Sequence, residues 1–137
     1  MNLAPLLTRL DIALTGHPSL GDKEIHIVDP EIIDDMQTQI GKENFTLYLE
    51  KYIDELHTVM TRIENHISSN EGENIIDPAH ALKSSSAQIG ALGASHLASR
   101  IEIAGIEGKI DVIKDCWDEI KDGFKQTITN LKAFQSK

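Results

Sequence analysis

The residues of this 137-residue chain that most clearly suggest chemistry are His80 and Lys83. On a helix with about 100° per residue, their spacing places both side chains on neighbouring parts of one surface. A neutral imidazole is nucleophilic, titrates near neutral pH and can accept a phosphoryl group at Nε2. An ammonium group one turn away can stabilise the phosphoryl oxygens as a point charge. The pair is therefore chemically able to accept a phosphoryl group, but a lone His-x-x-Lys pair is weak evidence for that function.

The residues around His80 predict a helix with one apolar face. The expected core-facing positions are Ile75, Ala79, Leu82, Ser86 and Ile89. His80 lies roughly opposite them, on a surface of mostly small side chains that lets another protein approach the imidazole closely. The predicted partner surface consists of Ser84, Ala87, Gln88 and Ala91.

The start of this helix decides how strongly the helix dipole acts on His80. If Asp77-Pro78 begins the helix, His80 lies in the first turn, where the positive end of the dipole favours the neutral ring and later the bound phosphate. If the helix begins near Asn74, this effect is weaker. The sequence leaves both starts open.

Two shorter helices are predicted in the N-terminal part of the chain. Leucines three or four residues apart predict an amphipathic helix over residues 3–14, and a linker at about 16–28 follows it. Charged residues inside this apolar segment argue against a signal peptide. Asp29-Pro30 is an N-cap followed by proline at the first helical position, so a second helix begins there and ends at Gly41.

Four longer helices follow and define the expected fold. Their approximate ranges are 43–68, 75–90, 94–107 and 110–135. Helices joined by short loops favour an all-α fold, an antiparallel up-down four-helix bundle with one or two extra N-terminal helices. We expect residues 1–26 to form the N-terminal amphipathic helix and linker, and residues 27–137 to form the bundle domain.

The composition argues against several function classes. The chain has 13 Lys and Arg residues against 22 Asp and Glu residues, a formal net charge of −9. This acidity argues against binding to nucleic acid or to an anionic membrane surface. One cysteine cannot form an internal disulfide, and no apolar stretch in the sequence is long enough to span a membrane. We therefore expect a cytoplasmic protein.

The other histidines do not suggest a metal site, because no two of them have the helical spacing of a ligand pair. They are His17, His26, His57, His66 and His96. Asp77 and His80 have this spacing but stand alone. Cys116, beside Trp117 in an apolar stripe, is expected to be a buried small hydrophobe rather than a nucleophile.

The segment around His80 resembles the histidine-containing phosphotransfer (HPt) domain. The usual pattern of that family is His-x-Leu-Lys-Gly-Ser-Ser/Ala, with Gly-Ala a few residues later. This chain matches it with His80-Ala81-Leu82-Lys83, Ser85-Ser86 and Gly90-Ala91. The long acidic helix predicted before the motif and the helix predicted after it also agree with the HPt family pattern. The resemblance covers roughly residues 27–135.

The resemblance implies a phosphorelay intermediate. HPt domains take a phosphoryl group from a receiver-domain aspartate and pass it to another, or exchange it with a histidine-kinase pathway. His80 would be the phosphorylated residue and Lys83 its electrostatic partner. In many family members a Glu or Gln on the following helix hydrogen-bonds the other imidazole nitrogen, and Glu102 stands at the matching position. A carboxylate at Nδ1–H would fix the tautomer and make Nε2 the better nucleophile.

The resemblance also implies partners and cofactors. It places Mg²⁺ in the receiver partner, so we expect no cofactor, no metal site and no kinase activity in this chain. The chain also lacks a glycine-rich phosphate loop for ATP. The expected partners are receiver domains of response regulators and hybrid histidine kinases, and we expect a free-standing monomer.

Ser84 departs from the family pattern, which has glycine directly after the lysine. We expect the serine to be tolerated, with its hydroxyl next to the phosphoryl group. The departure keeps an alternative function open: a helical module that binds a receiver domain or kinase without accepting phosphate. A helical-bundle metalloprotein is a third hypothesis.

Overall fold

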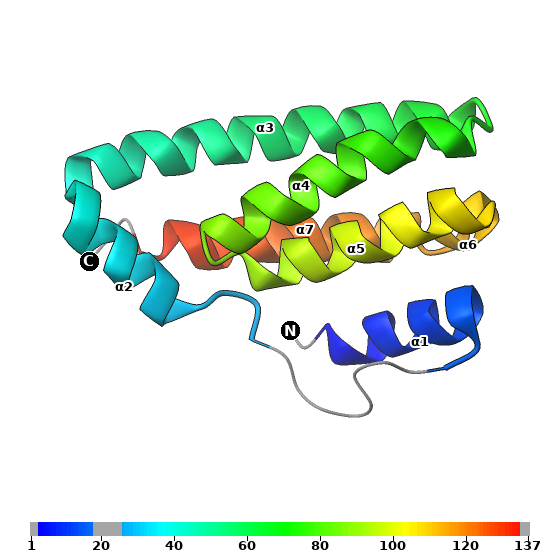
Figure 1. Cartoon of the computed structure of the whole chain (residues 1–137), viewed down its shortest axis with the longest axis horizontal. Helices are drawn as coiled ribbons and strands as arrows, with labels where there is room; N and C mark the ends of the chain where they lie inside the picture. Colours follow the sequence, from blue (N-terminus) through cyan, green and yellow to red (C-terminus); the bar gives the residue numbers. More distant parts are fainter. Residues whose placement is uncertain (1–2, 18–25, 135–137) are drawn as a thin grey trace.

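The computed structural model describes residues 3–17 and 26–134, and helices make up nearly all of them (Figure 1). In chain order the elements are α1 (Ala4–Thr15), α2 (Pro30–Ile40), α3 (Lys42–Ser68), the short 3-10 helix η1 (Gly72–Ile75), α4 (Ile76–Gln88), α5 (Leu92–Glu107), α6 (Ile110–Asp115) and α7 (Trp117–Lys132). No strand occurs in these described ranges. The prediction of an all-α bundle is confirmed.

Helices α3, α4, α5 and α7 form the bundle that carries the site. Figure 1 shows α3 along one long edge, α4 and α5 as neighbours joined by a short turn, and α7 behind them. Each helix contributes fully buried side chains to one hydrophobic core, because its apolar residues recur at helical spacing. One such fully buried residue from each helix is Phe45 of α3, Leu82 of α4, Leu97 of α5 and Phe124 of α7.

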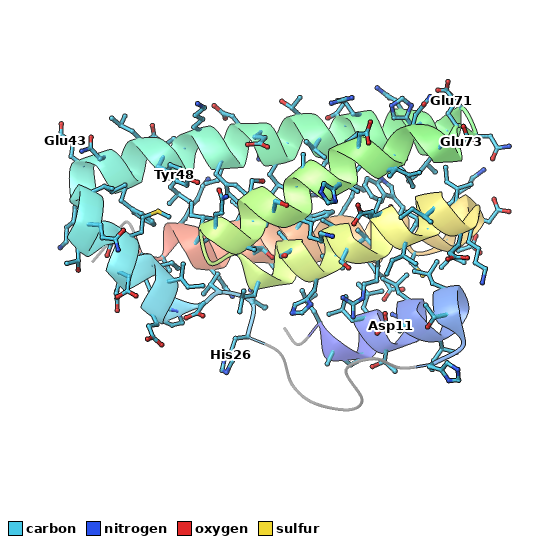
Figure 2. All side chains as sticks on the ribbon, viewed as in Figure 1. Asp11, His26, Glu43, Tyr48, Glu71 and Glu73 are labelled. Atoms are coloured by element: carbon cyan, nitrogen blue, oxygen red, sulfur yellow. The ribbon has the colours of Figure 1, made fainter. Side chains whose placement is uncertain are left out.

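The first helix, α1, packs against α5 and α6 and shares this core. Leu7 and Leu10 of this helix, and Leu3 directly before it, are fully buried, as the amphipathic pattern predicts. A buried ion pair adds to this packing: the guanidinium of Arg100 on α5 donates to both carboxylate oxygens of Asp11, at 2.8 and 3.1 Å. In Figure 2, Asp11 lies on α1 where that helix runs beside α5.

The chain enters the bundle at the N-terminus of α2. Asp29 caps this helix, because its Oδ1 accepts hydrogen bonds from the backbone N–H groups of Glu31 and Ile32 at 3.0 and 3.4 Å. The N–H of Asp29 also donates to the carbonyl of Gly90 at 2.8 Å, which ties this entry to the turn between α4 and α5. The helix predicted from Asp29-Pro30 to Gly41 is therefore confirmed, whereas most of the predicted linker lies outside the described residues.

The last predicted helix is divided in two at Cys116. This residue has φ −105° and ψ 8°, and its N–H is shared between the carbonyls of Val112 and Ile113 at 3.3 and 3.2 Å. Regular α-helical hydrogen bonding is interrupted there, so the prediction of a single helix over 110–135 was wrong. Cys116 is half-buried against the core rather than fully buried, and burial raises the pKa of its thiol.

Candidate functional site

The helix α4 holds His80 on the outer surface of the bundle. All five predicted core-facing positions of this segment are fully buried, so the predicted orientation of the helix is confirmed. The helix begins between the two predicted starts, because η1 ends at Ile75 and α4 begins at Ile76 without a side-chain cap. His80 is the fifth residue of α4, beyond the first turn, where the dipole effect is concentrated.

Glu102 of α5 joins His80 and Lys83 across the α4–α5 interface. Its Oε2 lies 2.6 Å from His80 Nδ1, and its Oε1 accepts a hydrogen bond from Lys83 Nζ at 2.8 Å. The His80 side chain is 61% exposed, whereas that of Glu102 is 13% exposed. The structure thus brings together the three residues that the sequence singled out, with the imidazole outermost.

Gly105, three residues after Glu102, allows α5 to lie this close to the start of α4. A Cβ atom at Gly105 would lie 2.6 Å from Cγ1 of Ile76 and 3.1 Å from the carbonyl oxygen of Gly72. Any larger residue would press against η1 and the first residue of α4, one turn away from Glu102 along α5. The close approach therefore helps to position the site.

The charge state of Glu102 follows from its surroundings. Its partial burial raises the pKa of the carboxyl, but hydrogen bonds from Lys83 and His80 lower it by more, so the pKa lies below the ordinary value. Glu102 is therefore ionised at neutral pH and can only accept hydrogen bonds. His80 Nδ1 must then carry the proton, and the lone pair of the neutral ring is on Nε2.

The predicted partner surface is exposed at three of its four positions. Ser84, Ala87 and Gln88 are exposed on α4. Ala91 is fully buried, so its assignment to this surface was wrong. The helix ends at Gln88, and Gly90 turns the chain with φ +80°, so the helical spacing no longer applies at Ala91.

A groove of about 240 Å³ lies between α3 and α4, next to these exposed residues. Its lining residues are Tyr48, Lys51, Tyr52, Glu55, Ser85 and Gln88. Figure 2 shows Tyr48 on the part of α3 that borders α4. Sequence reasoning missed this groove, although Tyr48, one of its lining residues, falls outside the apolar stripe of α3 and gave a signal.

Beneath the groove, the Tyr52 hydroxyl lies 2.5 Å from Ser86 Oγ, and both residues are buried. This hydrogen bond satisfies the one polar side chain on the core face of α4. Burial raises the pKa of the Tyr52 phenol well above its ordinary value, so Tyr52 stays neutral. The pair fixes α4 against α3.

The described part of the chain holds no group of three or more His, Cys, Asp or Glu side chains that could bind a metal ion. Within the same residues, no helix combines the length and the apolar character needed to cross a membrane.

Comparison with known proteins assigns this chain to a protein family. The model of the Hpt domain matches residues 47–133, which include α4, α5 and all three residues of the site. No curated protein and no solved structure matches the chain. Hpt domains take part in phosphotransfer within two-component signalling, as phosphocarrier modules rather than kinases. The match covers more than half of the sequence and confirms the resemblance seen around His80, and the chain therefore belongs to the Hpt domain family.

Proposed function

We propose that His80 accepts a phosphoryl group on Nε2 and exchanges it with receiver-domain aspartates. The observation that most supports this is the hydrogen bond between Nδ1 of the exposed His80 ring and the carboxylate of Glu102. A ring held at Nδ1 presents the unprotonated Nε2 as its nucleophile. Its exposure leaves room for an incoming protein.

The proposed step requires no proton transfer. The Nε2 lone pair attacks the phosphorus of an aspartyl phosphate in line with the acyl oxygen. The N–P bond forms while the P–O bond breaks, and the aspartate leaves as a carboxylate. The imidazole gains positive charge, which the Glu102 carboxylate beside Nδ1 stabilises. The reverse step returns the phosphoryl group to a receiver domain.

Lys83 supplies positive charge next to this reaction. Its ammonium is already close to the site because it donates to Glu102 at 2.8 Å. Phosphoryl transfer depends mainly on positioning and on neutralising charge on the phosphoryl oxygens. We assign the Mg²⁺ that shares this task to the receiver partner.

The partner would contact the exposed small residues around His80. Ser84, Ala87 and Gln88 form this surface on α4, and Gln88 also lines the groove between α3 and α4. A transient complex of this kind needs only a modest interface. The groove extends the contact surface towards α3.

The test is phosphoryl transfer from a panel of purified receiver domains that carry a labelled aspartyl phosphate. We expect an acid-labile, base-stable label on His80. His80→Gln should remain unlabelled and keep its helical circular dichroism spectrum, because the side chain faces solvent. His57→Gln, which changes an exposed histidine of α3, is the matched control and should be labelled like the original protein. Stable binding of a receiver domain without any label would favour the phosphorylation-independent module instead.

A further inference from the structure

We infer that Ser84 donates a hydrogen bond to the phosphoryl group on His80 and lengthens the lifetime of the phosphohistidine. This inference rests on the proposed function. Ser84 is exposed and lies one turn after His80 on α4. Side chains four residues apart on a helix have Cβ atoms about 5–6 Å apart and lean towards the N-terminus, so Ser84 leans over the turn that carries the imidazole.

The two flanks of His80 offer different groups. Lys83 and Glu102 lie on the flank that faces α5, and Glu102 holds Nδ1 there. Nε2 is on the opposite edge of the ring, and helical geometry places Ser84 on that other flank. Asp77 is also on that flank, one turn earlier, but a carboxylate offers no donor to a phosphoryl oxygen. Ser84, one turn from His80, thus places a hydroxyl donor on this flank.

The hydroxyl of Ser84 is available for this bond. Within residues 3–17 and 26–134, it has no hydrogen-bond partner. Several other hydroxyl side chains on the helices bond to a carbonyl of their own helix. Thr58 and Thr61 donate to carbonyls four residues earlier at 3.0 and 3.1 Å, and Ser85 donates to the Leu82 carbonyl at 3.3 Å. Ser84 therefore keeps its donor free beside His80.

The bond would act on the lifetime of the phosphohistidine. The Lys83 ammonium already donates a hydrogen bond to Glu102 and would have to serve a phosphoryl group as well. The phosphoryl oxygens would therefore have few hydrogen-bond donors from the protein. A hydroxyl that bonds to one of them stabilises the phosphohistidine and is released when the phosphoryl group departs to water. Loss of the hydroxyl should therefore speed hydrolysis of the N–P bond.

The experiment uses phosphoramidate, a small phosphoryl donor, so that no partner protein is needed. The original chain and its Ser84→Ala, Ser84→Thr and Thr129→Ala variants are phosphorylated and freed of phosphoramidate, and the decay of the phosphohistidine is followed by ³¹P NMR. We expect Ser84→Ala to shorten the phosphohistidine half-life about fivefold and to shift its ³¹P resonance. Ser84→Thr keeps the hydroxyl and should restore both. Thr129→Ala, the matched control at an exposed hydroxyl of α7, should change neither.

The two proposals fail in different ways. A Ser84→Ala half-life equal to or longer than that of the original chain would overturn the inference about Ser84 while His80 phosphorylation stands. A half-life of Ser84→Thr as short as that of Ser84→Ala would also overturn it, because the hydroxyl would then have no part in the effect. Absence of phosphohistidine on His80 in the original chain would overturn the proposed function and this inference with it.

Discussion

The Nδ1 atom of His80 lies 2.6 Å from Oε2 of Glu102, and these two residues are 22 positions apart in the chain. The contact depends on the antiparallel pairing of α4 and α5, whose close approach Gly105 permits. It holds the ring in one tautomer and places a negative charge beside the nitrogen that would become positive in the proposed transfer. The fold thus orients a surface histidine as the proposed function requires.

Replacing Glu102 should slow phosphorylation of His80. A hydrogen bond to a charged group contributes about 1.5–3 kcal/mol, so Glu102→Ala is expected to lower the rate of transfer from a phosphorylated receiver domain by tenfold or more. The transfer rate of Glu102→Gln should fall between those of the original chain and Glu102→Ala. Its amide oxygen can accept the hydrogen bond from Nδ1–H but carries no negative charge. Glu107→Ala, at an exposed position of the same helix, serves as the control. A Glu102→Ala rate equal to that of the original chain would remove the orienting role.

Replacing Lys83 should slow transfer without preventing it. Lys83→Ala removes a cation from a step that depends on charge neutralisation, and a loss of about tenfold is expected in the same assay. The variant should also raise the pKa of Glu102, because the hydrogen bond from Lys83 is the strongest influence that lowers it. NMR titration of the Glu102 carboxyl measures this shift. Lys125→Ala on α7 is the control, and unchanged transfer kinetics would exclude Lys83 from the mechanism.

Short-range spacing predicted the site because its geometry is mostly local to α4. The positions that the 3.6-residue period places inward, such as Leu82 and Ser86, are buried, and His80 on the opposite face is exposed. The same period failed at Ala91, because it carries no information about where a helix ends. Glu102 was matched through the family resemblance, since no local pattern links it to His80.

Contacts between segments that are distant in the chain could not be predicted from the sequence. Asp11 and Arg100 are 89 residues apart, and each looks like an ordinary charged residue on an amphipathic helix. Their pairing depends on how α1 lies on α5, and the periodicity of either helix does not determine that. The groove between α3 and α4 was missed for the same reason, because it depends on the relative placement of two helices.

The buried ion pair between α1 and α5 should matter for stability. Asp11→Ala leaves the buried Arg100 guanidinium without its carboxylate and should lower the free energy of unfolding by about 3–5 kcal/mol. Arg9 of the same helix pairs with Glu119 of α7, but that ion pair is exposed. Arg9→Ala should therefore have a much smaller effect in the same urea denaturation experiment. Equal effects of the two substitutions would contradict this ranking.

His96 should make the stability of the protein depend on pH near neutrality. Its ring is half-buried on α5 beside Arg100, and burial together with the Arg100 charge lowers its pKa. Between the ordinary histidine pKa of about 6.5 and this lower value, the unfolded chain binds more protons than the folded one. The contribution of His96 to stability is therefore present above about pH 6.5 and is lost as the pH falls towards the folded pKa. Urea denaturation across this range should show a flatter decline for His96→Gln, whereas His57→Gln, at an exposed position, should follow the original chain. Parallel curves for the original chain and His96→Gln would show that His96 does not link folding to pH.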